Sequence, residues 1–319
     1  MSRYDILNLG TAMVDIPVKL PYKTLDFKTE LTRIDNLKLM PGGDAANSSI
    51  ALSQLGNSVA LIAAVGDDAF GNEFLRQVQS RGVDVSHVAV KKGVNMSVCC
   101  VMVNSDGDRC FLFTQGSSET LCEGDFDYSL LDSGARHLNY SSFFLHPPLD
   151  SSGVESIFRA AKERGLTVSA DANTDYFNVG FEGVRKYLEY LDCFMPSYAE
   201  AKHLTGETEP GRMAEFIANK TGVKTIIIKL GAEGSYLYSN GKGGVIPAFS
   251  VKTVDTTGAG DNFVAGFLSA MLSGMDTEDC VRFGNAAAAL KIQHVGATSP
   301  VVTSENVRAF LKERGVNLG

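Results

Sequence analysis

Short, continuous runs of apolar residues alternate with helical segments along most of this chain, and that alternation restricts the fold more than any other feature. Most runs are flanked by a helical segment and end at Gly or Pro, as is typical of strands in a parallel sheet with both faces covered. The sequence therefore predicts a doubly wound α/β fold with a mostly parallel sheet. We expect strands at 5–10, 59–65, 167–170, 193–196 and 225–229, and helices that begin at Ala45 and Asn72.

Two stretches, 14–40 and 94–114, depart from this rhythm because polar and apolar residues alternate within them, as in Ser97–Val103. The Asn-Ser-Asp-Gly-Asp segment at 104–108 is expected to form a hairpin turn. Such alternation is typical of half-exposed antiparallel strands outside the main sheet. We therefore predict that the two stretches form a small β lid within a single domain spanning residues 1–319. An edge extension of the main sheet is the alternative.

The last third of the chain is expected to continue with strands, turns and two long helices. The strands are expected at 225–230, 235–238 and 248–251, the turns at 231–234 and 240–244, and the helices at 262–271 and 277–293. The alanine-rich stretch 282–290 favours either close helix packing or a wall beside a flat ring.

Charge and composition exclude several classes of protein. The chain has 319 residues, 44% of them apolar, and a formal net charge of −8. A negative charge argues against nucleic acid as a main partner, because surfaces that follow phosphate backbones need clustered Lys and Arg. No apolar run reaches about 18 residues, and the N-terminus leads directly into a strand, so we expect a cytoplasmic protein with no signal peptide and no membrane partner. The six cysteines include no C-x-x-C pair and are expected to be reduced packing thiols.

The segment 255–261, Asp-Thr-Thr-Gly-Ala-Gly-Asp, joins a β-rich region to an apolar helical run. Amides at a helix start are unpaired and attract anions, and Gly258, Ala259 and Gly260 leave those amides accessible. Asp261 would repel the same anion. The conflict disappears if a phosphoryl group passes across the helix start while Asp261 accepts the proton of an attacking hydroxyl. The alternative is an ordinary helix start, with the residues before Gly258 as capping residues.

A second glycine motif, Pro-Gly-Gly-Asp-Ala-Ala-Asn at 41–47, precedes another helical run. Gly42 and Gly43 allow the backbone to approach a ligand closely, and Asn47 offers both a donor and an acceptor to a polyol. A strand-to-helix turn without a ligand is the alternative. If Gly43 faces the ligand, a side chain in Gly43→Val would occupy the ligand's place and block its binding selectively.

Together, these two motifs resemble the N-terminal and C-terminal signatures of the ribokinase family of sugar and nucleoside kinases, also called the PfkB family. Asp15 falls where that family places a ligand for a sugar hydroxyl, so the matches extend over nearly the whole chain. The resemblance implies a ribokinase-like fold and transfer of the γ-phosphoryl group of ATP to an alcohol, with Mg²⁺ as cofactor. It also implies that the lid closes over the substrate and often pairs with another subunit, which suggests a homodimer.

The resemblance assigns a role to each residue at a matching position. Asp261 is the candidate base, and the amides of Gly258, Ala259 and Gly260 form the candidate anion hole. The candidate acceptor-binding residues are Asp15, Gly42, Gly43 and Asn47; Asp171 and Asn173 are added because their segment is placed for an active-site network, not because they match the family pattern. The candidate nucleotide-binding residues are Lys229, Gly231, Gly234, Thr257 and Asn285, with a solvent-facing Lys229 as the alternative.

Two cation sites are also implied. The segment 196–201 resembles the family's Asn-x-x-Glu segment that organises Mg²⁺ and phosphate, with Ser197 in place of the Asn and Glu200 retained. Glu200 is therefore a candidate for holding Mg²⁺ through water, and a surface helix glutamate is the alternative. The positions where related kinases bind a monovalent cation such as K⁺, mostly through carbonyls, are Asp255, Thr257, Lys291, His294 and Gly296.

The acceptor side departs from the family pattern. The chain reads Leu-His-Pro-Pro at 145–148, where ribokinase carries a glutamate. The segment 171–175 lacks the arginine of fructokinase-like and ketodeoxygluconate-kinase-like relatives. Ribose, fructose and ketodeoxygluconate are therefore not carried over as substrates, and we expect a small sugar or sugar derivative. His146 is either an acceptor contact or a structural histidine.

Other functions remain to be weighed against a sugar kinase. A nucleoside kinase of the same family would use Phe111, Phe113 or Met102 as an apolar slot for the base. A non-catalytic sugar or nucleoside sensor would not need to keep Asp261 inside an anion hole. A nicotinamide-dependent dehydrogenase would need G-x-G-x-x-G after the first strand, and a P-loop kinase would need G-x-x-x-x-G-K-[ST]. The sequence contains neither motif.

Overall fold

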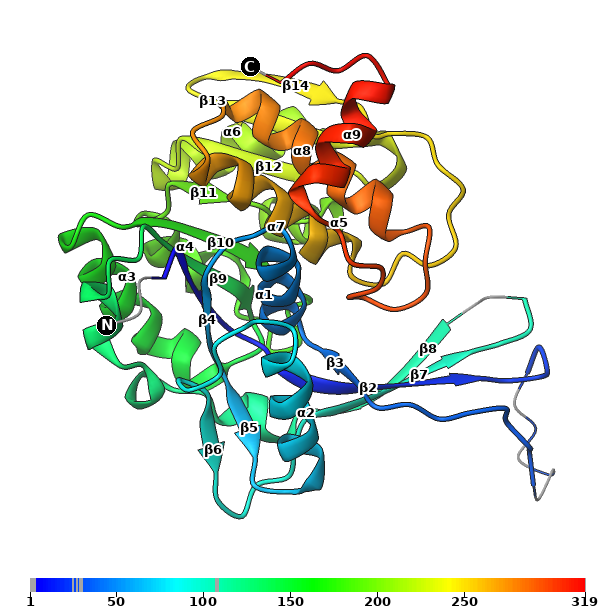
Figure 1. Cartoon of the computed structure of the whole chain (residues 1–319). Helices are drawn as coiled ribbons and strands as arrows, with labels where there is room; N and C mark the ends of the chain where they lie inside the picture. The colour runs from blue at the N-terminus through cyan, green and yellow to red at the C-terminus, as the bar shows by residue number, and fades with distance from the viewer. Residues whose placement is uncertain (1–3, 25, 27, 29–30, 107–108, 319) are drawn as a thin grey trace.

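The computed structural model describes residues 4–24, 26, 28, 31–106 and 109–318. The strands are β1 (Ile6–Leu9), β2 (Met13–Lys19), β3 (Met40–Gly42), β4 (Val59–Ile62), β5 (Ala64–Gly66), β6 (Ala89–Lys91), β7 (Val98–Val103), β8 (Arg109–Thr114), β9 (His137–Phe143), β10 (Thr167–Ala172), β11 (Cys193–Phe194), β12 (Thr225–Lys229), β13 (Ser235–Ser239) and β14 (Lys242–Ile246). The helices are α1 (Asp44–Gln54), α2 (Ala69–Gln79), α3 (Val154–Glu163), α4 (Gly180–Leu188), α5 (Tyr198–Thr205), α6 (Pro210–Thr221), α7 (Ala259–Leu272), α8 (Thr277–Lys291) and α9 (Ser304–Glu313) (Figure 1).

Within the described part of the chain, eight strands form the main sheet in the order β14-β13-β12-β11-β10-β9-β1-β4. The strands from β12 to β4 pair in parallel, whereas β13 and β14 add an antiparallel edge. Helices cover both faces of this sheet (Figure 1). The predicted doubly wound, mostly parallel α/β fold is therefore confirmed.

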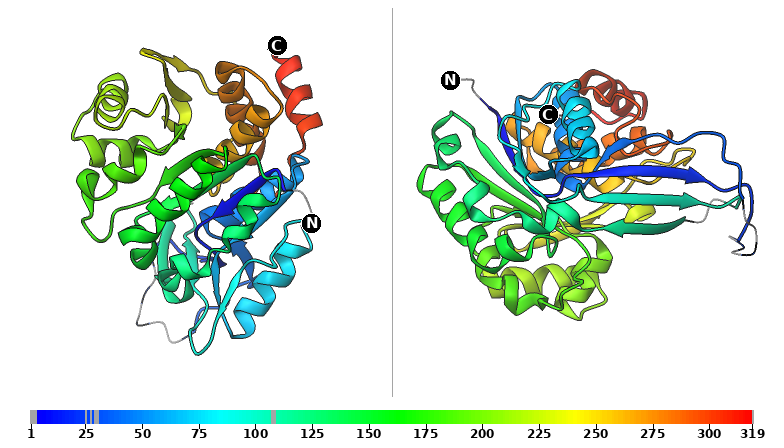
Figure 2. Two further views of the ribbon diagram at one scale, coloured as in Figure 1. Left: turned by 90° about the vertical axis from the view of Figure 1, so that its left-hand side faces the viewer. Right: turned by 90° about the horizontal axis from the view of Figure 1, so that it is seen from below.

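The two faces of the main sheet are packed by different sets of helices (Figures 1 and 2). Helices α1, α7, α8 and α9 share one buried apolar cluster with sheet residues such as Ile6 and Ile227. Helices α3 to α6 share the other cluster, which includes Leu7 and Ile228. Because neighbouring residues of one strand point into opposite layers, the strands read as continuous apolar runs in the sequence.

Helices α7 and α8 pack closely against each other at two glycines, Gly266 and Gly284. A Cβ atom on Gly266 would lie 2.9 Å from the Cβ of Ala287 and 3.0 Å from the Cα of Gly284. A Cβ atom on Gly284 would lie 2.8 Å from the carbonyl oxygen of Phe263. The two helix backbones therefore touch, so close helix packing accounts for small residues in the stretch 282–290.

A second sheet, in the order β3-β2-β7-β8, projects from the side of the main body (Figures 1 and 2). Its strands come from the stretches 14–40 and 94–114, with small extensions to Met13 and Gly42. Strands β2 and β7 pair in parallel because the chain returns through the main body between them, so the expected antiparallel pairing holds only for β2 with β3 and for β7 with β8.

Residues 25, 27, 29 and 30 of this region, and 107 and 108 of the predicted 104–108 turn, lie outside the described residues. The action of this sheet as a lid stays a prediction.

Several predicted elements differ in position from those observed. The run 59–65 divides into two strands, because β4 pairs with β1 whereas β5 pairs with β6 in a separate two-stranded sheet. Helix α2 begins at Ala69 rather than Asn72, since Asp68 caps it by accepting a hydrogen bond from the Gly71 amide at 2.9 Å. Helix α7 also begins three residues early, because Gly258 forms its N-cap, and α8 ends at Lys291, two residues early.

The predicted strand at 248–251 is wrong. Asn240 and Gly241 both have positive φ, 49° and 81°, as a two-residue hairpin turn requires, so β14 already begins at Lys242. This strand pairs with β13 and ends at Ile246, since Pro247 lacks the amide that would continue the ladder. The segment 248–251 lines a cavity instead.

Strand β9 is missing from the predicted strands, although it lies between β1 and β10 in the sheet. Polar residues, among them Asn139 and Ser141, interrupt its apolar pattern, yet every residue of the strand is buried. Their hydrogen bonds are made inside the protein: Asn139 donates to Asn8 Oδ1 at 2.8 Å, and Ser169 donates to Asn139 Oδ1 at 2.6 Å. A buried strand whose polar groups satisfy one another does not give an apolar run in the sequence.

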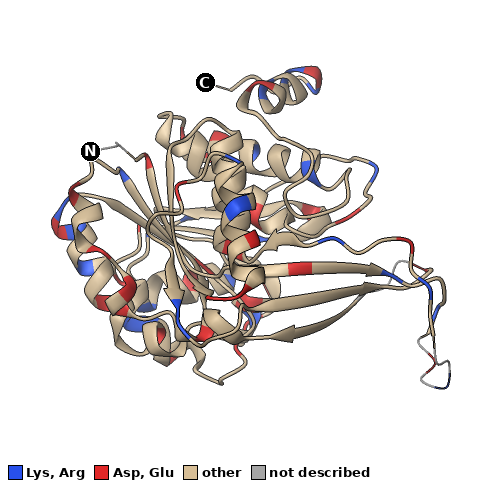
Figure 3. Cartoon of the chain, turned by 60° about the horizontal axis from the view of Figure 1, so that its bottom comes forward, with Lys and Arg blue, Asp and Glu red and all other residues tan. Residues whose placement is uncertain are grey.

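In the view of Figure 3, basic and acidic residues are interspersed along the ribbon. None of the helices in the described residues has the length and apolar character that crossing a membrane requires.

Candidate active site

The turn 256–261, at the start of α7, forms a wall between two cavities. Thr257, Gly258 and Asp261 line the first cavity, which has a volume of about 370 Å³ and extends to the second sheet. Thr256 and Ala259 line the second cavity, which has a volume of about 420 Å³ and lies against α8. Residues that follow β1, β9 and β10 also line the first cavity, at the carboxyl ends of parallel strands where open α/β sheets usually bind ligands. Two small molecules can therefore meet across this turn.

The start of α7 combines helix-end amides with a cation. Gly258 forms the N-cap with φ of +74°, and a Cβ atom there would lie 2.7 Å from the Cβ of Ala297. A Cβ atom on Gly260 would lie 3.6 Å from Nζ of Lys229, which places the lysine ammonium beside the predicted anion hole. The Ala259 amide donates to the carbonyl oxygen of Thr256 at 3.1 Å, so this one of the three predicted amides already has an acceptor.

Asp261, the candidate base, is held by Asn47. The Asn47 amide nitrogen donates to Asp261 Oδ2 at 2.8 Å and so links the two glycine motifs. Asn47 is 5% exposed, and its Oδ1 is buried without a hydrogen-bond partner among the described residues. Burial raises the pKa of Asp261 and the nearby Asp44 raises it further, whereas Asn47 and Lys229 oppose the rise. Asp261 therefore has the surroundings of a carboxylate that accepts a proton readily.

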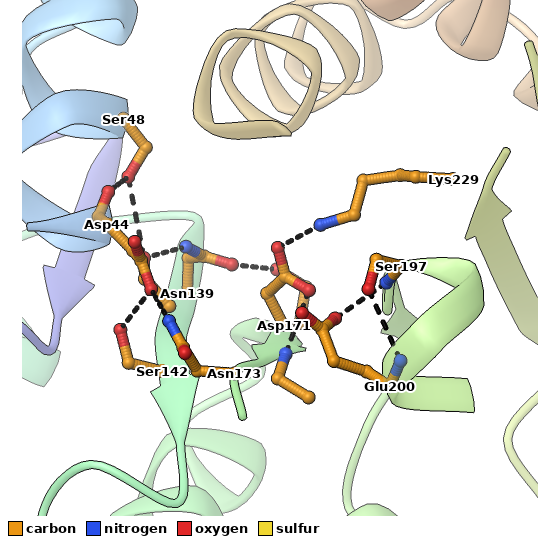
Figure 4. Close-up of polar contacts among 12 residues, drawn as sticks. Asp44, Ser48, Asn139, Ser142, Asp171, Asn173, Ser197, Glu200 and Lys229 are labelled. Atoms are coloured by element: carbon orange, nitrogen blue, oxygen red, sulfur yellow. Dashed lines mark hydrogen bonds and ion pairs between the residues drawn. The ribbon is translucent and has the colours of Figure 1, made fainter. Parts of the chain in front are cut away.

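Asp44 also lines the first cavity beside Asp261, and it is not among the residues predicted from the sequence. Its carboxylate accepts hydrogen bonds from Ser142 Oγ at 3.1 Å and from Asn173 Nδ2 at 2.8 Å (Figure 4). Burial raises the pKa of Asp44, and these two hydrogen bonds oppose the rise. The signal that could have identified it is its position directly after Gly43, in the first turn of a helix that also carries a ligand-site motif.

Asp15 and Gly43 line the same cavity, and Gly42 makes room for Asp15. A Cβ atom on Gly42 would lie 2.3 Å from Cγ of Asp15. Burial, and then the charge of Asp44, raise the pKa of the half-buried Asp15 to about 7. A Cβ atom on Gly43 would lie 2.5 Å from the carbonyl oxygen of Thr11, at φ of +91°. The expected reason for selective loss of ligand binding in Gly43→Val is therefore wrong, because the added side chain would strike the backbone of the neighbouring loop.

Lys229, at the end of β12, forms an ion pair with Asp171 and does not point to solvent (Figure 4). Burial lowers the pKa of Lys229, but the charges of Asp171 and Glu200 outweigh burial, so the pKa is raised and the ammonium stays charged. Burial raises the pKa of Asp171, Lys229 opposes the rise, and Glu200 adds to it. Asp171 is not among the described residues that line the first cavity, but it lines a small void together with Asp44 and Asp261, so its contact with the acceptor stays a prediction.

Glu200 and Ser197 cap α5 together. The Ser197 amide donates to Glu200 Oε2 at 2.6 Å, and the Glu200 amide donates to Ser197 Oγ at 3.3 Å (Figure 4). Within the described residues, no three Asp, Glu, His or Cys side chains form a group that could hold a metal alone. Mg²⁺ commonly binds through one or two carboxylates, waters and substrate phosphates, and Glu200 with Asp171 fits that mode.

The second cavity contains part of the predicted nucleotide site. Gly231 and Asn285 line it, together with the segment 248–251. Ala288 and Ala289 add a wall of small side chains on the α8 side. This is the flat wall that the alanine-rich stretch favours, so the two interpretations of that stretch apply to different residues.

Two residues of the predicted nucleotide site support the second cavity. Asn285 Oδ1 accepts a hydrogen bond from Ser235 Oγ at 2.9 Å, and its amide nitrogen donates to the Ile246 carbonyl oxygen at 3.2 Å. A Cβ atom on Gly234 would lie 2.2 Å from that same oxygen. The amide group of Asn285 therefore holds the wall in place. Thr257 lines the first cavity rather than the second.

The positions predicted for a monovalent cation lie together beside the turn. The carboxylate of Asp255 accepts hydrogen bonds from the amides of Thr257 and Gly296, both at 2.8 Å. Lys291 Nζ donates to the carbonyl oxygen of Asp255 at 2.9 Å and to that of His294 at 3.4 Å. The ammonium of Lys291 thus contacts carbonyl groups that were expected to bind a cation.

The second sheet supplies the apolar side of the first cavity. Val101, Phe111 and Phe113 line it, and the Phe113 ring lies 5.7 Å from the ring of Tyr176, which also lines the cavity. Met102 is not among the described lining residues, because alternate residues of β7 point to opposite faces. The cavity therefore has a polar floor of carboxylates and an aromatic rim.

His146 supports the cavity without lining it. It is fully buried, its Nε2 lies 3.2 Å from Thr11 Oγ1, and its Nδ1 lies 2.8 Å from the Ser118 carbonyl oxygen. Burial lowers the pKa of His146 to about 4, so the ring stays neutral at physiological pH. The structure favours the structural histidine, which orients Thr11 in the cavity wall.

Comparison with known proteins agrees with this geometry. The family model of pfkB family carbohydrate kinases matches residues 5–304. The chain belongs to the PfkB family of carbohydrate kinases. Ribokinase of Haemophilus influenzae is 28% identical over 314 residues, covering 97% of this chain and 99% of the relative. The ATP-dependent ribose-1-phosphate kinase of Halopiger xanaduensis is 31% identical over 273 residues, covering 86% of this chain and 87% of the relative.

A solved structure extends the comparison to three dimensions. Arabidopsis thaliana ribokinase, solved in complex with ribose and ATP, has a TM-score of 0.82 to this PfkB kinase and 26% sequence identity, covering 97% of this chain and 99% of that one. The predicted family and the ribokinase-like fold are confirmed. The chain is a carbohydrate kinase, that is, a phosphotransferase with an alcohol group as acceptor.

Proposed function

We propose that this PfkB kinase transfers the γ-phosphoryl group of ATP to a hydroxyl of a small sugar or sugar derivative. The observation that carries the proposal is the turn 256–261, which separates two cavities of about 370 and about 420 Å³ and presents a carboxylate to only the first. Both volumes suit small ligands. In this proposal the first cavity binds the acceptor and the second binds the nucleotide.

The acceptor hydroxyl would lose its proton to Asp261. The Asn47 hydrogen bond fixes the orientation of that carboxylate, and its raised pKa brings proton affinity closer to the working pH. The unpaired Oδ1 of Asn47 is a buried acceptor that a second ligand hydroxyl would satisfy. Asp15, on the same wall, would accept from a further hydroxyl, so the polar floor suits a polyol.

The migrating phosphoryl group would be stabilised on the other side of the same turn. The amides of Gly258 and Gly260 point from a helix start, and the ammonium of Lys229 lies close to Gly260. Glu200 and Asp171 would hold Mg²⁺ through water. When bound, that ion supplies charge neutralisation on the donor phosphates.

A nucleoside is the second candidate acceptor. The observation in its favour is the aromatic rim, since Phe111, Phe113 and Tyr176 offer ring faces on which a base can stack. The free sugar remains the first choice because the opposite wall is built from Asp15, Asn47 and Asp261.

The test is ADP release from ATP and Mg²⁺ with a panel of sugars, sugar acids and nucleosides. On the best acceptor, Asp261→Asn should lower kcat by about 10²-fold to 10⁴-fold, the usual contribution of general base catalysis. Asp132→Asn, on the surface at a residue paired with Arg164, is the matched control and should retain activity. Turnover by Asp261→Asn equal to that of the parent would exclude the proposed base.

A thermal-shift screen with a nonhydrolysable ATP analogue distinguishes the acceptor classes. Stabilisation by nucleosides alone would replace the sugar by the nucleoside. Stabilisation by ligands of the panel with no ADP release for any of them would contradict the proposed transfer to a small sugar.

We also propose the expected homodimer, which would pair through the second sheet. Strand β8 forms the edge of the second sheet, and Phe111, Leu112 and Phe113 on it are 53%, 58% and 45% exposed. An exposed apolar edge strand is a natural pairing surface for a second copy. Sedimentation of the full chain tests this, and a monomer at every concentration would contradict it.

A further inference from the structure

Lys291 is a fully buried lysine at the last position of α8. Its ammonium donates to the carbonyl oxygens of Asp255 and His294, at 2.9 and 3.4 Å. Buried ammonium groups are rare because the charge loses its hydration, and they persist where oxygen atoms replace the lost water. One oxygen comes from the segment directly before the turn 256–261, and the other comes from the loop that follows α8.

The carboxylate of Asp255 completes the surroundings of this ammonium. Its two oxygen atoms accept hydrogen bonds from the amides of Thr257 and Gly296, both at 2.8 Å, so the carboxylate lies between the two segments that Lys291 joins. The arrangement of carbonyl oxygens around one positive charge, with a carboxylate beside them, is that of a monovalent cation site.

The two segments joined by Lys291 also fix the position of the turn 256–261. The amides of Val254 and Asp255 donate to the Ile292 carbonyl oxygen at 2.7 and 3.1 Å. The side-chain amide of Asn262 donates to the carbonyl oxygens of Gly258 and Ala297, at 2.8 and 3.0 Å. The position of the turn that forms the wall between the two cavities thus depends on how firmly the two segments are tied.

A potassium ion does not fit these residues. It would need the Asp255 and His294 carbonyl oxygens as ligands, and the Lys291 ammonium already contacts both. A second positive charge at the same oxygens would be repelled by the first. The predicted K⁺ ligands are thus present, but a side chain of the protein occupies their centre.

We propose that the ammonium of Lys291 replaces the monovalent cation, and that this kinase is therefore independent of K⁺ and Na⁺. Lys291 is a positioning residue: it touches neither cavity and acts by holding the turn 256–261 in place. This inference depends on one part of the proposed function, namely that the nucleotide phosphate binds at that turn.

The parent chain tests the proposal without any variant. Binding of a nonhydrolysable ATP analogue with Mg²⁺ is measured by calorimetry in choline chloride, NaCl and KCl at one ionic strength. We expect the three dissociation constants to agree within threefold. Tighter binding by more than threefold in KCl or NaCl would overturn the proposal. No acceptor is needed, so failure here is distinct from failure to find a phosphorylated sugar.

A substitution tests the role of the charge itself. Lys291→Met keeps a similar volume without the ammonium, and Lys312→Met, on an exposed lysine near the end of α9, is the matched control. In choline chloride, Lys291→Met should bind the analogue at least tenfold more weakly, and KCl or NH₄Cl should restore at least part of this loss. Unchanged affinity, or a loss in a natively folded variant by circular dichroism that neither salt relieves, would contradict the proposal. The parent measurement stands if the variant does not fold.

Discussion

Two aspartates in opposite electrostatic surroundings bracket the turn 256–261: Asp255 directly before residue 256, and Asp261 as its last residue. At the first end, Asp255 accepts two backbone hydrogen bonds and lies near Lys291, and its pKa is lowered. At the other end, Asp261 is buried near Asp44, and its pKa is raised. One carboxylate is thus stabilised in its charged form, and the other is kept ready to take up a proton. Environments that separate the pKa values of nearby carboxylates are a common basis for separating structural from catalytic roles.

The largest stability effects should come from exchanging each aspartate for asparagine. Asp255→Asn should lower the free energy of unfolding by about 2 kcal/mol, since it exchanges a hydrogen bond to a charged oxygen for an unpaired amide. Asp261→Asn should raise the melting temperature of the ligand-free protein at pH 8, because it removes a charge that burial disfavours. Urea unfolding and thermal melts measure the two effects. If both variants shifted in the same direction, the contrast between the two ends of the turn would be lost.

Asp44→Asn should give a smaller effect, visible in the pH profile. The negative charge of Asp44 raises the pKa of Asp261, so its removal lowers that pKa and leaves Asp261 deprotonated at more acidic pH. The acid limb of kcat/KM should therefore move to lower pH, and Asp132→Asn should leave it in place. A limb that stays fixed or moves upward in Asp44→Asn would show that this pair is not coupled.

The smallest effect is expected for Asp15→Asn in the absence of ligands. The pKa of Asp15 rises from 3.8 to about 7 on folding, so its contribution to stability is present below pH 3.8 and is lost as the pH rises through about 7. Asparagine stays neutral, so the melting temperature of the variant should fall less than that of the parent over this range. Because Asp15 is only half-buried, we expect a difference of a few degrees. Parallel curves for the two proteins would refute the assignment.

The sequence alone was sufficient for those parts of the fold where burial and residue type agree. Strands such as β4 and β12 are apolar because both faces are covered, and the glycine motifs mark helix starts whose chemistry is local. Strand β9 was not predictable in this way, because its buried Asn139 is satisfied by side chains from other strands. The strand expected at 248–251 failed because the Asn240–Gly241 turn moved the pairing register towards the N-terminus.

The same limit applies to the site. Asp261 could be proposed as the base because the Gly258 and Gly260 amides beside it in the site are also its neighbours in sequence. Asp44 was missed because its partners, Ser142 in β9 and Asn173 directly after β10, are distant in sequence. Lys291 lies at the place that the sequence indicates, but nothing in the local sequence shows that its ammonium reaches the carbonyl groups expected to bind an ion.

Because the backbones of α7 and α8 touch at Gly266 and Gly284, neither helix can slide or rotate past the other without a collision. The beginning of α7 and the end of α8 should therefore move as one rigid body. If the projecting second sheet acts as the predicted lid, it should open and close against this rigid base.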